Sequence, residues 1–345
     1  MKLNQKTILA MAATALLSGT AMAETGVTIY GRGNVSIEQQ KVGSVSESVF
    51  VDNSSRIGVR AKRDIEGGLN AGVTLEAATN LTTGSTNSKI FAREASVHVG
   101  GAFGQVKLGK LPGSAAYFAT ADYVSNHNHD TGTSSDALWD YPAAFQLERA
   151  VAYTSPKING MTFEGQYGLK NGTASGETTS TLVNPVSLAA NYAVGALQLG
   201  LGHERGANAF TSATTDTMSA TTVRAFYTMG PWGFGGYAQK TTGDKAARTS
   251  LRLSAMYTMG QNEFHVNLGT AGNRDSVQDT GAKQFTLGYN FNLDKQTKVY
   301  ALYTKIDQDS ATSFYQTDYA SRFIKGSTGN GNTLSSFGVG VRYNF

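Results

Sequence analysis

The sequence predicts an all-β fold, a 16-stranded antiparallel β-barrel that crosses a membrane. Three observations carry this prediction. Apolar and polar residues alternate with a period of two along most of the chain, as they do in strands with one apolar face. Short and long connections between the predicted strands follow each other in turn. After the N-terminal segment there is no apolar run near 18 residues, the length that a membrane-spanning helix requires.

The N-terminal segment, residues 1–23, has the layout of a secretory signal peptide. Lys2 and Lys6 precede an apolar run at residues 8–17, and small residues follow at 21–23. The run is too short for a spanning helix, the other interpretation of this segment. The remaining residues, 24–345, show no change of composition that would mark a linker, so we expect a single barrel domain.

Composition limits the classes of function. The formal net charge of the chain is +4, and removing the two lysines of residues 1–23, which contain no acid, leaves +2. This balance gives no reason to expect nucleic acid as a partner, because nucleic-acid binding needs a concentrated basic surface. Cysteine is absent, so the chain forms no disulfides and must be held by hydrogen bonding and packing.

The first predicted strand illustrates the alternation. Val27, Ile29, Val35 and Ile37 share one face, and polar residues such as Glu38 occupy the other. The same reasoning predicts sixteen strands, at residues 26–39, 53–64, 68–79, 90–100, 104–110, 149–155, 161–170, 185–193, 196–205, 220–229, 232–240, 247–258, 262–271, 281–291, 297–305 and 335–345.

The connections indicate an up-and-down barrel with one short-looped and one long-looped end. Tight turns are predicted at residues 64–67, 101–103, 156–160, 194–195, 230–231 and 259–261. Long polar segments are predicted at residues 40–52, 171–184, 206–219 and 306–334. Outer-membrane barrels have this pattern, whereas a soluble β-sandwich, the alternative, has no reason to separate its loops by length. Closure is required because hydrocarbon offers no hydrogen-bond partner to an open sheet edge.

Four segments carry a resemblance to a known family. They are residues 27–33 (VTIYGRG), 55–69 (SRIGVR followed by DIEGGL), 103–110 (FGQVKLGK) and 153–160 (YTSPKING). On these motifs the chain resembles the trimeric general porins of Gram-negative outer membranes, in the branch found in Neisseria and Burkholderia. The resemblance runs from end to end. It implies a homotrimer in outer-membrane lipid that forms a water-filled channel for passive diffusion of ions and small hydrophilic solutes.

The resemblance also implies a constriction loop. In that family the third external loop, after the fifth strand, folds into the lumen and narrows it, and the matching segment here is residues 111–148. A strand-free stretch of this length is uncommon unless it has a function. The other interpretation is a solvated acidic loop. The candidate constriction acids are Asp122, Asp130, Asp136, Asp140 and Glu148.

Opposite such a loop the family has a basic wall. Alternation turns Arg32, Arg56, Arg60, Lys62, Lys170, Arg224, Arg252, Lys298 and Arg342 toward the lumen, against Glu38, Glu76 and Glu164. Arg93 and Arg149 complete the candidate wall by resemblance, although strict alternation groups each with apolar residues. The excess of basic over acidic side chains predicts a modest anion preference.

The remaining predictions concern assembly and alternative functions. Phe345 resembles the terminal signal that outer-membrane assembly machinery recognises. We expect no cofactor and no enzyme activity, since no Gly-x-Ser-x-Gly nucleophile motif occurs. An outer-membrane hydrolase and an adhesin or surface antigen remain as alternatives. His127, His129 and Asp130 form a weak metal motif, and we expect no metal site.

Overall fold

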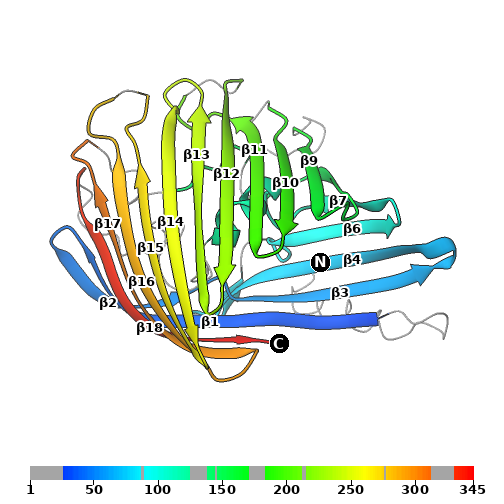
Figure 1. Ribbon diagram of the computed structural model, residues 1–345, viewed down its shortest axis with the longest axis horizontal. Coiled ribbons are helices and arrows are strands. Elements are labelled where there is room, and N and C mark those ends of the chain that lie inside the picture. The colour runs from blue at the N-terminus through cyan, green and yellow to red at the C-terminus, as the bar shows by residue number, and fades with distance from the viewer. Residues whose placement is uncertain are drawn as a thin grey trace, which may run out of the picture.

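The structure is a closed antiparallel β-barrel (Figure 1). This computed structural model describes residues 26–86, 89–124, 138–143, 146–170, 183–211, 215–275, 277–311 and 330–345. The sixteen predicted strands are confirmed. Two labels add to that number, because β2 and β3 are successive parts of one barrel strand paired with β1, and β5 is a two-residue strand on β4.

The strands follow one another around the barrel in chain order. Their bounds are β1 Gly26–Val42, β2 Val45–Asp52, β3 Arg56–Ile65, β4 Leu69–Asn80, β5 Ser85–Thr86, β6 Glu94–Gly101, β7 Gly104–Lys110, β8 Ala150–Thr154, β9 Met161–Gly168, β10 Val186–Val194, β11 Leu197–Ala207, β12 Thr217–Met229, β13 Trp232–Thr242, β14 Arg248–Met259, β15 Asn262–Ala271, β16 Ala282–Asn292, β17 Thr297–Gln308 and β18 Leu334–Asn344.

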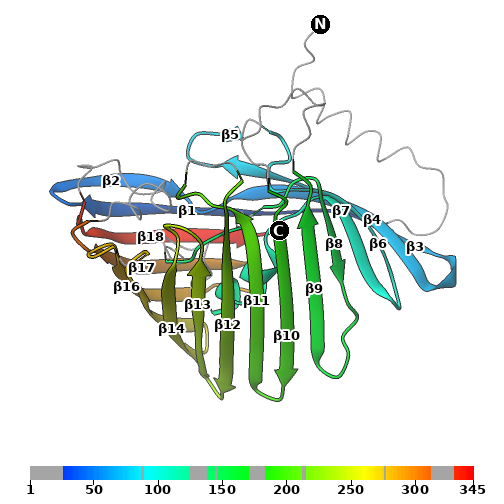
Figure 2. The same ribbon diagram turned by 90° about the horizontal axis from the view of Figure 1, so that it is seen from above.

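The first and last strands close the barrel. β1 pairs with β18 from Arg32 opposite Asn344 to Val42 opposite Leu334, and on its other edge it pairs with β2 and β3. Figure 2 shows β18 and β1 running side by side, with the remaining strands curving round from them. Closure leaves β1 with a hydrogen-bonded neighbour on both edges, as a strand in hydrocarbon requires.

The two faces of the sheet differ in chemistry as the alternation predicts. On β18 the outward side chains of Phe337, Val339 and Val341 are exposed on the isolated chain, whereas inward Ser336 and Arg342 are buried. Apolar residues therefore cover the outer surface and polar residues line the inside, which is the arrangement that a lipid environment stabilises.

One predicted loop is a hairpin instead. Residues 40–52 extend the first two strands to a tight turn at Gly43 and Ser44, with Val42 opposite Val45. Gly43 has a φ of +58°, a conformation that glycine adopts readily. In this extension Val42 and Val51 face inward and are buried, whereas outward positions include Lys41 and Ser48, so the outward apolar pattern stops although the ladder continues.

Helices are few in the described part of the chain. They are η1 Glu66–Gly68, α2 Ala115–Ala119 and α3 Ala121–Val124. Among the described residues no helix is long and apolar enough to cross a membrane.

Candidate functional site

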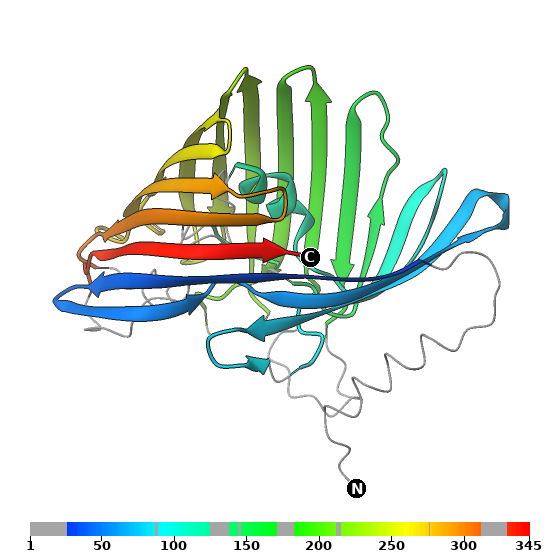
Figure 3. The same ribbon diagram turned by 90° about the horizontal axis from the view of Figure 1, so that it is seen from below.

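The described parts of the segment between β7 and β8 lie inside the barrel. Its helices α2 and α3 contact the inner faces of β9 to β13, and Figure 3 shows them behind β16 and β17, within the ring of strands. Residues 125–137 and 144–145 of this segment lie outside the described residues. In ring order β11 is diametrically opposite β1, so α2 and α3 pack on the side of the barrel that faces the β1 wall.

Wall side chains hold the start of α2. Ser114 caps the helix, its Oγ accepting a hydrogen bond from the Tyr117 amide at 3.1 Å. The next free amides find partners on the wall: Ala115 N donates to Gln166 Oε1 at 3.1 Å and Ala116 N to Ser187 Oγ at 3.0 Å. Three orphan donors of the first turn are therefore satisfied, two of them by the barrel itself.

Glycines on β11 let the segment approach the wall closely. A Cβ at Gly202 would lie 2.7 Å from the Ala116 Cβ, and one at Gly206 would overlap the backbone of Pro142. Gly200 faces Ala119 in the same way. The inward face of β11 is thus shaped to receive helix α2 and the Pro142 turn.

Asp140 anchors the far end of the segment to β13 and β14. Its carboxylate accepts two bonds from Arg248, Nε to Oδ2 at 2.8 Å and Nη2 to Oδ1 at 2.6 Å, and one from Arg274 at 3.0 Å. Thr241 adds a fourth donor at 2.8 Å. Burial alone would raise the pKa of this carboxyl, but the two guanidinium groups hold the pKa of Asp140 below its usual value of 3.8. Asp140 therefore does not act as an open constriction acid.

An aromatic cluster fills the space between segment and wall. Trp139 packs edge-on against Tyr117, with ring centroids 5.7 Å apart, and against Tyr237 of β13 at 5.2 Å. Trp139, Tyr117 and Tyr237 are all at most 4% exposed. Such contacts exclude water and fix the segment in position.

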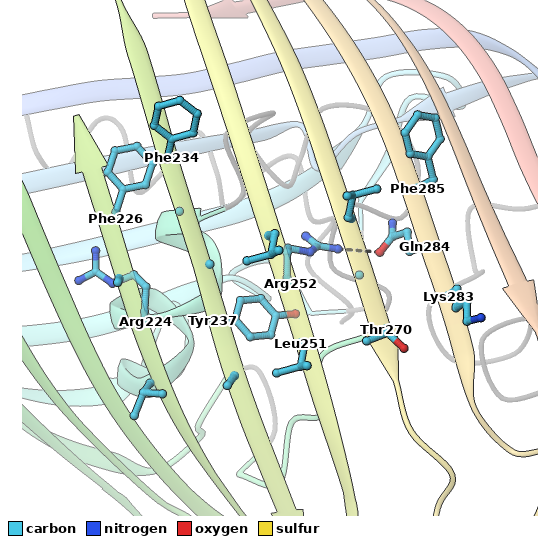
Figure 4. A pocket seen from close by; sticks show the side chains of 18 of the residues that line it. Arg224, Phe226, Phe234, Tyr237, Leu251, Arg252, Thr270, Lys283, Gln284 and Phe285 are labelled. Atoms are coloured by element: carbon cyan, nitrogen blue, oxygen red, sulfur yellow. Dashed lines mark hydrogen bonds between the residues drawn. The ribbon is translucent and has the colours of Figure 1, made fainter. Parts of the chain in front are cut away.

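Arg252 lies under this segment and not on the open wall. It faces inward, as alternation predicts, but it is 1% exposed, and Figure 4 shows it reaching Gln284, whose Oε1 accepts from Arg252 Nη2 at 2.6 Å. Val124 O accepts from Ser254 Oγ at 2.7 Å on the same strand, so the loop covers this part of the wall. Arg224, 4% exposed, is covered likewise.

The opposite wall, around β1, β3 and β4, carries a network centred on Glu76. Arg93 Nε donates to Glu76 Oε1 at 2.6 Å, and an Arg56 nitrogen lies 3.9 Å from the same oxygen. Tyr30 OH donates to the other oxygen at 2.9 Å, and the Arg60 guanidinium lies 4.0 Å above the Tyr30 ring. Glu76 thereby orients arginines from two different parts of the chain.

The position of Arg93 resolves its conflict with alternation. β6 begins at Glu94, so Arg93 lies in a bend before the ladder, where the strand period does not apply. Arg149 likewise precedes β8 and has a φ of +49°. Its side chain is exposed. Alternation fails at Arg93, whose side chain reaches Glu76, because the backbone there bends, whereas the pore-facing position of Arg149 stays a prediction.

The other predicted wall residues are spread along the barrel. Arg32 and Arg342 each donate to Asn344 Oδ1 at 3.2 Å. Lys62 is exposed near the turn end of β3, 3.6 Å from Asp64.

The remaining predicted acids do not form one cluster in the described structure. Asp122 is half-buried in α3. Glu148 pairs with Lys110 at 2.7 Å and Lys89 at 3.3 Å, and the hydrogen bond from Lys110 lowers its pKa against the opposing effect of burial. The predicted acids Asp130 and Asp136, with the histidine motif at 127–129, lie outside the described residues.

Several charged residues of the site escaped the sequence prediction. Arg248 and Arg274 bind Asp140, and Lys107 pairs with Glu94 at 3.0 Å. The alternation of apolar and polar residues in β14 and β7 could have identified Arg248 and Lys107 as inward-facing. Arg274 lies after the end of β15, where no periodicity applies.

Comparison with known families identifies the protein class. The family model described as "Gram-negative porin" matches residues 9–312, most of the chain. The chain belongs to this family. The porin matches "Outer membrane porin protein 32" of Delftia acidovorans with 26% identity, over 99% of this chain and all of the relative.

Solved structures share the fold of this porin. The "Anion-selective porin from Comamonas acidovorans" matches with a TM-score of 0.74 and 21% identity, over 93% of this chain and all of that chain. The trimer form of OmpT from Vibrio cholerae matches with a TM-score of 0.65 and 18% identity, over 94% of this chain and all of that chain. These comparisons favour neither the hydrolase nor the adhesin interpretation.

The porin is thus an outer-membrane diffusion channel, and the lumen described above is its passage. Within the described residues no group of three or more His, Cys, Asp or Glu side chains could hold a metal ion. The charged groups of the lumen are arranged to attract or repel solutes at its walls.

Proposed function

We propose that this channel has a modest anion preference, and that its narrowest passage lies between the loop of residues 111–148 and the wall around β1. The observation that supports this proposal is the division of the lumen into two sides. The loop covers the β9 to β14 side, whereas Arg32, Arg56, Arg60 and Arg93 belong to strands and bends on the opposite side.

The charge arrangement supports attraction of anions by weak, distributed forces. Glu76 satisfies Arg56 and Arg93 together, so this local group of one acid and two bases keeps a positive balance. Arg60, stacked on Tyr30, adds a further cation. Lumenal charges bounded by low-dielectric walls raise the local concentration of counter-ions without forming a tight complex.

The test is the reversal potential of single channels in a KCl gradient. We expect the reversal potential to be shifted from zero toward the chloride equilibrium potential. The shift should be smaller in the Arg60→Gln variant. Lys157→Gln, which removes the same charge from an exposed turn residue, is the control and should leave the potential unchanged. A cation-selective wild-type channel would contradict the proposal.

We also propose that the porin assembles as a homotrimer after removal of residues 1–23, with Phe345 serving as an assembly signal. Residues 1–25 lie outside the described residues. The trimer form recorded for a solved structure of the same fold supports the homotrimer. Conductance steps in groups of three, together with the mass of the purified protein in detergent, test the trimer. N-terminal sequencing of the exported chain tests the cleavage.

A further inference from the structure

Three cations gather on the inner face of β17, β18 and β1, near the turn end of the barrel. Lys298 is opposite Arg342 in the β17–β18 ladder, Arg342 is opposite Asn34, and Asn344 is opposite Arg32. Figure 3 shows these three strands side by side. Their inward phase turns all three basic side chains into the lumen.

One amide oxygen holds the two arginines together. Asn344 Oδ1 accepts from Arg32 Nε and from Arg342 Nε, each at 3.2 Å, so the two nitrogens are no more than twice that distance apart. Arg342 is 7% exposed, while Arg32 and Lys298 are half-buried. The shared acceptor therefore fixes two of the three cations, and Arg32 and Lys298 keep part of their surface open to solvent.

The chemistry of this cluster suits an oxyanion. Like charges held this close repel one another, and Asn344 is neutral, so it orients the guanidinium groups without offsetting their charge. Glu263 on β15, which accepts from Asn290 at 2.9 Å and lies 3.5 Å from His265 Nε2, also interacts electrostatically with Lys298, so one acid faces three cations and the balance stays positive. Guanidinium forks match the geometry of carboxylate and phosphate oxygens, and an ammonium adds a third, movable donor.

We propose that Arg32, Lys298 and Arg342 form a weak binding site for small oxyanions carrying carboxylate or phosphate groups. This site deepens the proposed anion preference and rests on it. It borders the Glu76 group, since Arg32 is opposite Arg56 in the β1–β3 ladder, but Arg342 and Lys298 lie on the other side of β1 from Glu76. Lys298 lies near the turn end of β17, whereas Arg32 belongs to the wall of the proposed passage, so anions in the passage reach the site directly, and its three cationic groups favour oxyanions over chloride.

The experiment measures chloride current through single channels while inorganic phosphate, or in a second arm succinate, is added to one side. We expect a saturable fall in current at millimolar concentration. Arg342→Gln and Lys298→Gln should each raise the half-saturating concentration at least fivefold, and Arg342→Lys should recover part of the loss. Lys295→Gln, which removes a charge from the exposed turn before β17, is the matched control and should behave like wild type.

The outcomes separate this site from the anion preference. If the channel prefers chloride but phosphate and succinate act equally on wild type and all lumenal variants, the oxyanion site is overturned and the preference stands. A cation-selective reversal potential in the same records overturns both. Should Arg342→Gln fail to assemble, Lys298→Gln and Arg32→Gln carry the comparison. Reduced block by phosphate alone, with succinate unaffected, assigns the site to phosphate groups.

Discussion

The position of the inward loop depends strongly on one side chain, the carboxylate of Asp140. This carboxylate joins the loop to Arg248 on β14, which is fully buried, and to Arg274 beyond β15, whose side chain is 11% exposed. A buried charge is tolerated only with such partners, because removing one partner leaves the others uncompensated. This residue therefore couples the position of the loop to the charge state of one group.

Replacing Asp140 with Asn tests this coupling. We expect destabilisation of the seated loop by about 3–5 kcal/mol, since two guanidinium groups would remain buried without their acid. Noise in the open-channel current should rise. Asp244→Asn, which changes an exposed acid in another loop, is the control and should leave the current noise unchanged. Adding Arg248→Met to the Asp140→Asn variant should restore part of the stability. An Asp140→Asn channel with the same current noise as wild type would contradict the role of Asp140 as an anchor of the loop.

The same carboxylate sets a pH dependence. Its folded-state pKa is lowered below 3.8, so its contribution to stability is fully present above that value and is lost as the pH falls through the folded pKa. We therefore expect no change in current noise between roughly pH 5 and 8, and increasing noise only below about 3.8. Recording wild-type channels across this range checks the sign, and a transition near neutral pH would be incompatible with Asp140 as the anchor.

At the scale of elements, strand β11 and helix α2 form a matched pair. The inward glycines of β11 leave room for the helix, and amides of the helix bond to side chains of β9 and β10. The loop is thus seated by shape as well as by charge. Because this seat involves backbone, a larger side chain cannot be accommodated by a change of rotamer alone.

The substitution Gly202→Val tests the packing of α2 against β11. The added methyl groups would meet Ala116, and overpacking of this kind typically costs about 1–3 kcal/mol. We expect α2 to move toward the open lumen, which lowers single-channel conductance. Gly165→Ala on β9 is the control, because a Cβ there makes only an ordinary contact of 3.6 Å with Leu188. Unchanged conductance in an assembled Gly202→Val channel would argue against the seat.

The strands were predictable from the sequence because the bilayer imposes a regular pattern on them. Within the membrane one face of each strand meets lipid, so Phe337, Val339 and Val341 mark the phase without ambiguity. The pattern fails in two places. In residues 40–52 the apolar side chains of Val42 and Val51 face inward and are buried while outward positions are largely polar, and at Arg93 and Arg149 the backbone leaves the extended conformation.

The site was less predictable than the strands, because alternation gives direction but not contact. It turned Arg252 inward correctly, yet it could not show that the loop lies over that part of the wall. The partners of Asp140 are 108 and 134 residues away in sequence. Such pairings depend on how the loop folds back, which no local pattern records.

At the scale of the whole molecule, stability depends on joining the two ends of the chain. Gly31 N donates to Phe345 O at 2.9 Å and Phe345 N donates to Gly31 O at 3.1 Å. The Phe345 ring occupies the space beside Gly31, where any side chain would also approach Arg56 O within 2.6 Å. The last residue therefore completes the ladder between β18 and β1.

Phe345→Ala separates a role in assembly from one in conduction. The backbone bonds to Gly31 survive this change, so an assembled channel should keep its conductance. We expect several-fold less assembled protein in the outer membrane, because the aromatic ring contributes both to closure and to the proposed signal. Tyr343→Ala is the matched control: Tyr343 is 48% exposed on the same outward face, against 46% for Phe345, and stacks on it with centroids 6.0 Å apart. Equal losses in the two variants would reduce Phe345 to one aromatic among several, whereas a larger loss in Phe345→Ala, with normal conductance in the remainder, supports a specific role in assembly.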